Sequence, residues 1–147
     1  MPFSSSSHVR ILYVDDDQDS SDLLSLMLYQ SDNTYSVTTI STAKEALNIM
    51  QHLSFNLYIL DYALPELSGV ELCQKIREKD KQTPIMFFTA MARPEDYAAG
   101  IKAGANEYLV KPNDLEKLTE TVKRLLNKGK LIYKRKTISR KRCSSII

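Results

Sequence analysis

The chain has 147 residues, of which 43% are hydrophobic and 26% charged, which is typical of one globular domain rather than of a disordered segment. It has no apolar run near the ~20 residues that span a membrane, and its Ser-rich start lacks a signal-peptide pattern. Its two cysteines, Cys73 and Cys143, form no CxxC pair, which argues against a disulfide framework or a zinc site and favours a reducing cytoplasm.

Charge is distributed unevenly along the chain. Residues 128–147 contain eight Lys or Arg residues and no Asp or Glu, whereas residues 1–127 contain 12 basic and 18 acidic residues, a net charge of −6. We therefore expect a flexible N-terminus (1–7), an acidic domain (8–127) and a basic C-terminal tail or linker (128–147). We favour a solvated extension or a severed linker for this tail over a contact with nucleic acid, membrane lipid or an acidic protein.

Five short apolar segments alternate with stretches whose apolar residues recur at helical spacing. The predicted strands are Val9–Val14, Tyr35–Ile40, Leu57–Leu60, Ile85–Thr89 and Glu107–Val110. Such alternation indicates an α/β fold with a parallel sheet that is covered by helices on both faces.

Capping residues mark the start of each of the five predicted helices. In chain order these starts are Asp19, Ser20 or Ser21; Thr42 with Glu45; Ser68 with Glu71; Pro94; and Asn113 with Glu116. The second helix is predicted to run to about His52. The fourth is predicted to end at Gly104, because glycine favours the left-handed conformation that closes many helices.

Polar side chains gather where the predicted strands end. Asp15 and Asp16 follow the first strand, Asp61 the third, and Lys111 the fifth, while Thr89 ends the fourth. In a parallel sheet these ends share one edge, where ligands of α/β proteins bind. Crowded carboxylates need a cation, and hard oxygen ligands favour Mg²⁺ or a similar ion. A hydroxyl and an ammonium beside such an ion can hold a phosphoryl group that is accepted by an aspartate nucleophile.

Four motifs in this order make the chain similar to a known family. They are ILYVDDD at 11–17, YILDYALP at 58–65, FTA at 88–90 and AGANEYLVKP at 103–112. Over about residues 8 to 127 the chain resembles the receiver domain of two-component response regulators. The resemblance implies a flavodoxin-like, doubly wound (βα)5 fold with strand order 2-1-3-4-5.

The resemblance also implies roles for individual residues. Asp61 corresponds to the phosphoacceptor, and Asp15 and Asp16 correspond to the acidic pair that binds Mg²⁺ or Mn²⁺ together with Asp61. The backbone carbonyl of Ala63 corresponds to a further metal ligand. Helix capping is assigned to Asp17 and Asp19 rather than to Asp15 and Asp16.

The same resemblance implies a switch. Thr89 and Lys111 are expected to contact the phosphoryl group, and Tyr108 corresponds to the aromatic that turns inward when Thr89 moves. The bond between Lys111 and Pro112 is expected to be cis. We assign Tyr13, which lies near the acids, to packing.

The resemblance implies a signalling module rather than an enzyme. The expected partners are a sensor histidine kinase or a histidine phosphotransfer protein, and a downstream effector protein or a missing output domain. A homodimer through the strand-five face is a further expectation, although Asn113 and Asp114 differ from the pattern of many DNA-binding members.

Two other functions are compatible with parts of the pattern. A phosphatase of the haloacid-dehalogenase type also uses a strand-end aspartate with Mg²⁺, but it needs a second aspartate where this chain has Ala63. A degenerate receiver that serves only for docking is the other alternative, and the complete set of acids argues against it.

Overall fold

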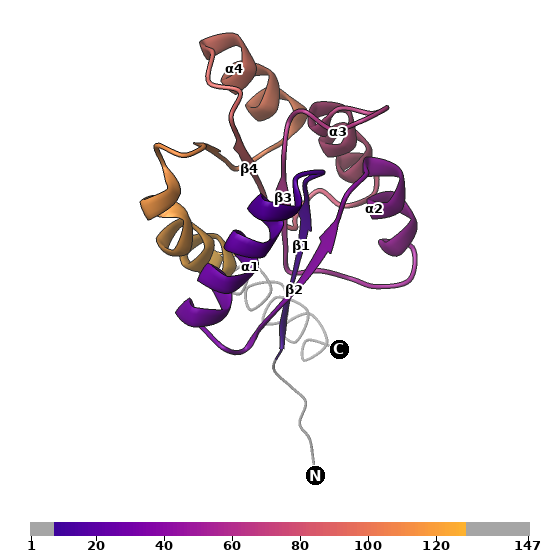
Figure 1. Ribbon diagram of the computed structural model, residues 1–147. Coiled ribbons are helices and arrows are strands. Elements are labelled where there is room, and N and C mark those ends of the chain that lie inside the picture. The colour runs from indigo at the N-terminus through magenta and orange to yellow at the C-terminus, as the bar shows by residue number, and fades with distance from the viewer. Residues whose placement is uncertain (1–7, 129–147) are drawn as a thin grey trace, which may run out of the picture.

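The computed structural model describes residues 8–128 of the chain. Strands and helices alternate as predicted (Figure 1). The elements are β1 (Val9–Val14), α1 (Gln18–Ser31), β2 (Tyr35–Ile40), α2 (Ala43–Ile49), β3 (Leu57–Leu60), α3 (Gly69–Lys79), β4 (Ile85–Thr89), α4 (Pro94–Ala103), β5 (Glu107–Val110) and the 3-10 turn η1 (Leu115–Lys117). A C-terminal helix follows η1 and is described over 118–128.

The five strands form one parallel sheet. Their order is β2-β1-β3-β4-β5, which confirms the predicted topology. The last residue of β1, Val14, pairs with Ile40 on one side and with Leu60 on the other. Thr89 pairs with Val110 at the end of β5. This register brings the carboxyl ends of the strands, and the polar residues that follow them, to one edge of the sheet.

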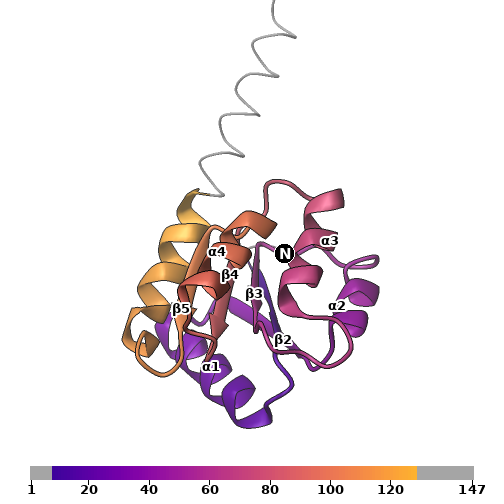
Figure 2. The ribbon, with the colours of Figure 1, turned by 90° about the horizontal axis from the view of Figure 1, so that it is seen from above.

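Helices cover both faces of the sheet (Figure 2). On one face, α1 and the C-terminal helix pack on the sheet through Leu24, Leu28, Leu118 and Val122. On the other face lie α2, α3 and α4, and their buried side chains there are Ala43, Ala46, Leu72, Cys73, Ile76 and Ala103. All four residues of β3 are buried, and burial of each large apolar side chain contributes about 1.5–3 kcal/mol. The packing of this central strand therefore fixes the position of the loop that follows Leu60.

Three helix starts use the predicted caps. The Thr42 and Ser68 hydroxyls accept hydrogen bonds from the backbone N–H groups of Glu45 and Glu71, respectively. Pro94 begins α4, and Gly104 ends it with a φ of 117°, a left-handed conformation that suits glycine.

Other helix ends differ from the prediction. α1 begins at Gln18, so Asp17 takes the N-cap position, as its assignment to helix capping predicted, and the alternative starts at Asp19, Ser20 and Ser21 are two to four residues late. α2 ends at Ile49, before His52.

The predicted cap at Asn113 is wrong. The Asp114 carboxylate instead accepts a hydrogen bond from the Val110 N–H at 2.9 Å, while the Asp114 N–H donates to the Val110 carbonyl at 2.8 Å. This reciprocal pair closes a turn, and the C-terminal helix therefore starts through η1 (Leu115–Lys117).

Arg77 ties α3 to two loops at the edge of the sheet opposite the strand ends. Its guanidinium donates hydrogen bonds to the carbonyls of Gly104 at 2.9 Å, Asp80 at 3.0 Å and Thr83 at 2.8 Å, and to the Asn106 side chain at 3.0 Å. One side chain thus holds the start of β4 and the turn before β5 in place.

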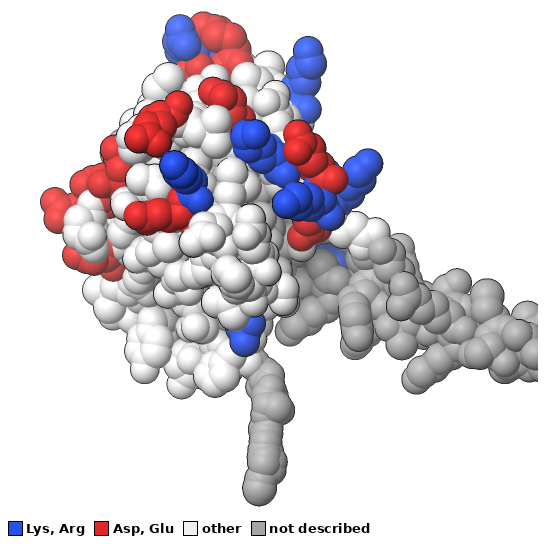
Figure 3. Space-filling model, turned by 90° about the vertical axis from the view of Figure 1, so that its right-hand side faces the viewer, with Lys and Arg blue, Asp and Glu red and all other residues white. Residues whose placement is uncertain are grey.

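Two surface features bear on binding to membranes and nucleic acids. Among residues 8–128, no helix combines the length and apolar character needed to cross a bilayer. On the side of α2 and α3, acidic and basic groups are mixed and the lower part carries little charge (Figure 3). This face lacks the continuous basic surface that nucleic-acid binding uses. The N-terminal segment 1–7 and nearly all of the predicted basic tail (129–147), including Cys143, lie outside the described residues.

Candidate functional site

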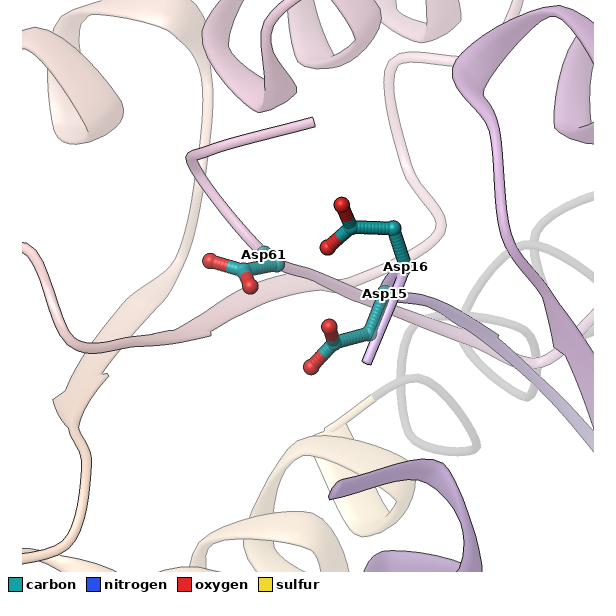
Figure 4. A group of neighbouring side chains, drawn as sticks. All are labelled: Asp15, Asp16 and Asp61. Carbon is teal, nitrogen blue, oxygen red and sulfur yellow. The ribbon is translucent and has the colours of Figure 1, made fainter. Parts of the chain in front are cut away.

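Three carboxylates meet where β1 and β3 end (Figure 4). Asp15 and Asp16 follow β1 and Asp61 follows β3, and one oxygen from each lies within 4.8 Å of the others. Asp15 and Asp61 are buried, whereas Asp16 is exposed and makes no hydrogen bond or ion pair with any described residue. An all-oxygen set with one unpaired carboxylate fits Mg²⁺ or Mn²⁺, which bind carboxylates and retain several waters.

Lys111 supplies positive charge to this acidic group. The cis bond between Lys111 and Pro112, predicted from the sequence, is present. Lys111 Nζ lies 2.5 Å from Asp15 Oδ2 and 3.6 Å from Asp61 Oδ2, and its side chain is only 18% exposed. At this depth the ammonium offsets part of the repulsion between the two carboxylates.

The surroundings of Asp61 act on the pKa of its carboxyl group in opposite directions. Burial raises the pKa of Asp61, and the negative charge of Asp15 acts in the same direction. A hydrogen bond with the Thr89 side chain, the charge of Lys111 and the N–H of Ala63 lower this pKa and limit the rise. A poorly solvated carboxylate is a stronger base and nucleophile than an exposed one, and a bound cation would offset the cost of its charge.

Ala63 and Gly69 shape the loop over Asp61. The Ala63 N–H donates to Asp61 Oδ1 at 3.3 Å, while the role of its carbonyl as a metal ligand stays a prediction. The Gly69 N–H donates to the Tyr62 carbonyl at 2.8 Å. A Cβ on Gly69 would stand 2.0 Å from the Asp61 carbonyl oxygen, so only glycine lets α3 begin this close to the site.

Thr89 and Tyr108 are joined through one intervening residue. The Met91 N–H donates to Thr89 Oγ1 at 3.3 Å, and the Tyr108 hydroxyl donates to the Met91 carbonyl at 2.7 Å. Tyr108 is 7% exposed, so its ring lies inward, and its centroid is 5.5 Å from those of both Phe87 and Tyr97. The sequence gives no signal for Met91, because its backbone rather than its side chain makes the connection.

Tyr13 also belongs to the site, although the sequence analysis assigned it to packing. Its side chain is fully buried, and its hydroxyl donates a hydrogen bond to Asp15 Oδ2. Burial and this contact with Asp15 raise the pKa of Tyr13, so the phenol remains a protonated donor. The available signal was the i, i+2 spacing, which places Tyr13 and Asp15 on the same face of the strand.

The comparison with known proteins agrees with this geometry. Residues 11–123 match the family model of the response regulator receiver domain. The chain belongs to the response regulator receiver family. A receiver is a signalling module of two-component systems rather than a classical enzyme, which disfavours the phosphatase alternative.

Relatives and solved structures of receivers cover most of the chain. An uncharacterized 14.6 kDa protein of Leptolyngbya boryana is 43% identical over 106 residues, 71% of this chain and 79% of that protein. The response regulator ArlR of Staphylococcus epidermidis is 36% identical over 118 residues, 80% of this chain but only 52% of ArlR. This receiver thus spans about half the length of ArlR.

The fold is shared with solved receivers. A CheY-like receiver domain protein from Methanospirillum hungatei superimposes with a TM-score of 0.78 at 31% identity, over 84% of this chain and 98% of that one. The BeF3-activated DrrB receiver domain gives a TM-score of 0.74 at 33% identity, over 82% of this chain and 99% of that one.

Proposed function

We propose that this receiver accepts a phosphoryl group on Asp61 in a reaction that depends on Mg²⁺ or Mn²⁺, and that the modification switches a protein-interaction face. The observation that carries this proposal is the position of Asp61, a buried carboxylate that lies beside Asp15 and Asp16 and 3.6 Å from the ammonium nitrogen of Lys111. Phosphoryl transfer depends mainly on such positioning and charge stabilisation.

The residues of the site suit the chemistry of transfer from a phosphohistidine. An Asp61 oxygen attacks phosphorus, the bond between phosphorus and the donor nitrogen breaks, and its electron pair stays on that nitrogen. Lys111 and Thr89 would hold the phosphoryl oxygens. Asp15, Asp16 and Asp61 would hold the cation, which neutralises charge on the phosphoryl group when it is bound.

An exposed apolar stripe beside the site supports a protein as the phosphoryl donor. Leu23, Leu26 and Tyr29 on α1 are 47%, 54% and 60% exposed and recur every three residues. α1 starts directly after the acidic pair, so a histidine kinase or phosphotransfer protein that covers this stripe would lie next to Asp61. We propose this face of α1 as the docking surface of the donor.

A second exposed apolar region lies next to Tyr108. Tyr97 and Ile101 on α4 are 53% and 37% exposed, and the ring of Tyr97 contacts that of Tyr108. A change at Thr89 that reached Tyr108 through Met91 would therefore alter this region. We propose it as the face presented to a downstream effector, an output domain or a second copy of the chain.

The test is the intact mass of the protein after incubation with acetyl phosphate and Mg²⁺. We expect the wild type to gain one phosphoryl group, and Asp61→Asn or added EDTA to abolish the gain. Asp22→Asn, which changes an exposed acid of α1, is the matched control and should be labelled normally. A wild type that neither acetyl phosphate nor a histidine kinase can label would instead support the docking-only receiver.

A further inference from the structure

The Asp15 carboxylate is held by three hydrogen-bond donors. Oδ2 accepts from the Tyr13 hydroxyl and from Lys111 Nζ, the latter at 2.5 Å. Oδ1 accepts from the Asp17 N–H at 2.9 Å. A carboxylate oxygen offers about two acceptor positions, so both positions on Oδ2 are filled and one remains on Oδ1. Tyr13 and Lys111 together thus leave Oδ1 as the oxygen available to a cation or to its water.

The two donors on Oδ2 differ in how firmly they are fixed. Lys111 has a long flexible side chain that is 18% exposed, and its Nζ already lies 3.6 Å from Asp61 Oδ2. Tyr13 is a rigid ring with no exposed surface, packed in the same apolar cluster as Leu24 and Leu28 of α1. If the ammonium moves toward a group on Asp61, only Tyr13 still holds Oδ2.

We propose that Tyr13 is a positioning residue of the metal site. Its hydroxyl occupies Asp15 Oδ2, keeps Oδ1 directed to the cation, and maintains this orientation when Lys111 turns to a phosphoryl group. The proposal rests on the proposed function. Removing a donor that hydrogen-bonds to a metal ligand without touching the metal typically weakens metal binding by about 10–100-fold.

The test is a calorimetric Mg²⁺ titration of the full chain as wild type and as Tyr13→Phe, which removes only the hydroxyl. We expect the variant to bind Mg²⁺ about tenfold more weakly. Its phosphorylation by acetyl phosphate should need more Mg²⁺ but reach the wild-type rate at saturation. Tyr58→Phe is the matched control, since Tyr58 is also a buried tyrosine, lies on β3, and has a hydroxyl that makes no hydrogen bond to the acids. It should bind Mg²⁺ like the wild type.

The outcomes separate the positioning role from the proposed function. Equal or tighter Mg²⁺ binding by Tyr13→Phe overturns the role of Tyr13 alone. A wild type that binds no Mg²⁺ overturns the proposed function together with this role. If the Tyr13→Phe variant does not fold, NMR of the wild type tests the proposal. The Tyr13 hydroxyl proton should exchange slowly and stay protected when Mg²⁺ and beryllofluoride are added, and loss of its protection would overturn the proposal.

Discussion

Gly100→Ala tests how α4 accommodates the inward ring of Tyr108. Gly100 lies in α4 directly against this ring. A Cβ added there would stand 3.0 Å from Tyr108 Cδ2, 3.1 Å from Tyr108 Cε2 and 3.2 Å from Phe87 Cδ2. Normal carbon contacts begin near 3.5 Å, so the ring must shift by several tenths of an ångström or leave.

Two effects of this substitution oppose each other. Alanine is more favourable than glycine in a helix by about 1 kcal/mol. Overpacking of a well-packed site costs about 1–3 kcal/mol, and this cost falls only on the state in which Tyr108 is inward. An outward ring avoids the clash but gives up the 2.7 Å hydrogen bond to the Met91 carbonyl, which is worth about 0.5–1.5 kcal/mol. We expect the ratio of outward to inward Tyr108 rings to rise by about tenfold, which corresponds to about 1.4 kcal/mol.

The assay is NMR of ring-labelled tyrosine, combined with urea unfolding. Ala98→Gly on the exposed face of α4 is the matched control, because it measures helix propensity without a clash. If Tyr108 in Gly100→Ala keeps its inward chemical shifts while stability rises by the full ~1 kcal/mol of helix propensity, the steric argument is wrong.

Two further predictions concern stability. Arg77→Ala should lower the free energy of unfolding by about 2–3 kcal/mol, because three backbone carbonyls and one side-chain amide lose a charged donor. The matched control Arg124→Ala breaks only an exposed ion pair with Glu107 and should cost less than ~1 kcal/mol. Equal losses for the two variants in urea unfolding would contradict the role of Arg77. The pKa of Asp61 is raised in the folded state, so the folded protein binds the Asp61 proton more tightly than the unfolded chain does. The contribution of Asp61 to the free energy of unfolding therefore falls as pH rises from its pKa in the unfolded chain to its higher pKa in the folded protein, and it stays unfavourable at neutral pH. Asp61→Asn should therefore be more stable than the wild type in urea unfolding at pH 7 with EDTA, and the gain should disappear at acid pH; a variant less stable than the wild type at pH 7 would contradict this.

The order and type of the strands and helices were predictable because the apolar segments of the sequence are the segments that the fold buries. β3 is uniformly apolar and uniformly buried. Asp61 lies at the strand end because the apolar run stops at Leu60. Asp15, Asp61 and Lys111 converge because a parallel sheet puts all carboxyl ends on one edge. No contact between these side chains had to be known in advance.

Other features depend on three-dimensional contacts that spacing does not encode. The capping pattern at Asn113 failed because Asp114 formed a closer turn with Val110. The role of Tyr13 was missed because a tyrosine in a strand looks like packing until its hydroxyl is seen to reach Asp15. The connection between Thr89 and Tyr108 runs through the backbone of Met91, which any residue type could provide.

The most direct test of the central claim is chemical mapping of the phosphoryl acceptor. The protein is incubated with acetyl phosphate and Mg²⁺, reduced with borohydride, and analysed by peptide mass spectrometry, because borohydride converts an aspartyl phosphate to homoserine. We expect homoserine at position 61 only, and none when Mg²⁺ is replaced by EDTA. Homoserine at another acid, with Asp61 intact, would contradict the assignment of Asp61 as the phosphoacceptor.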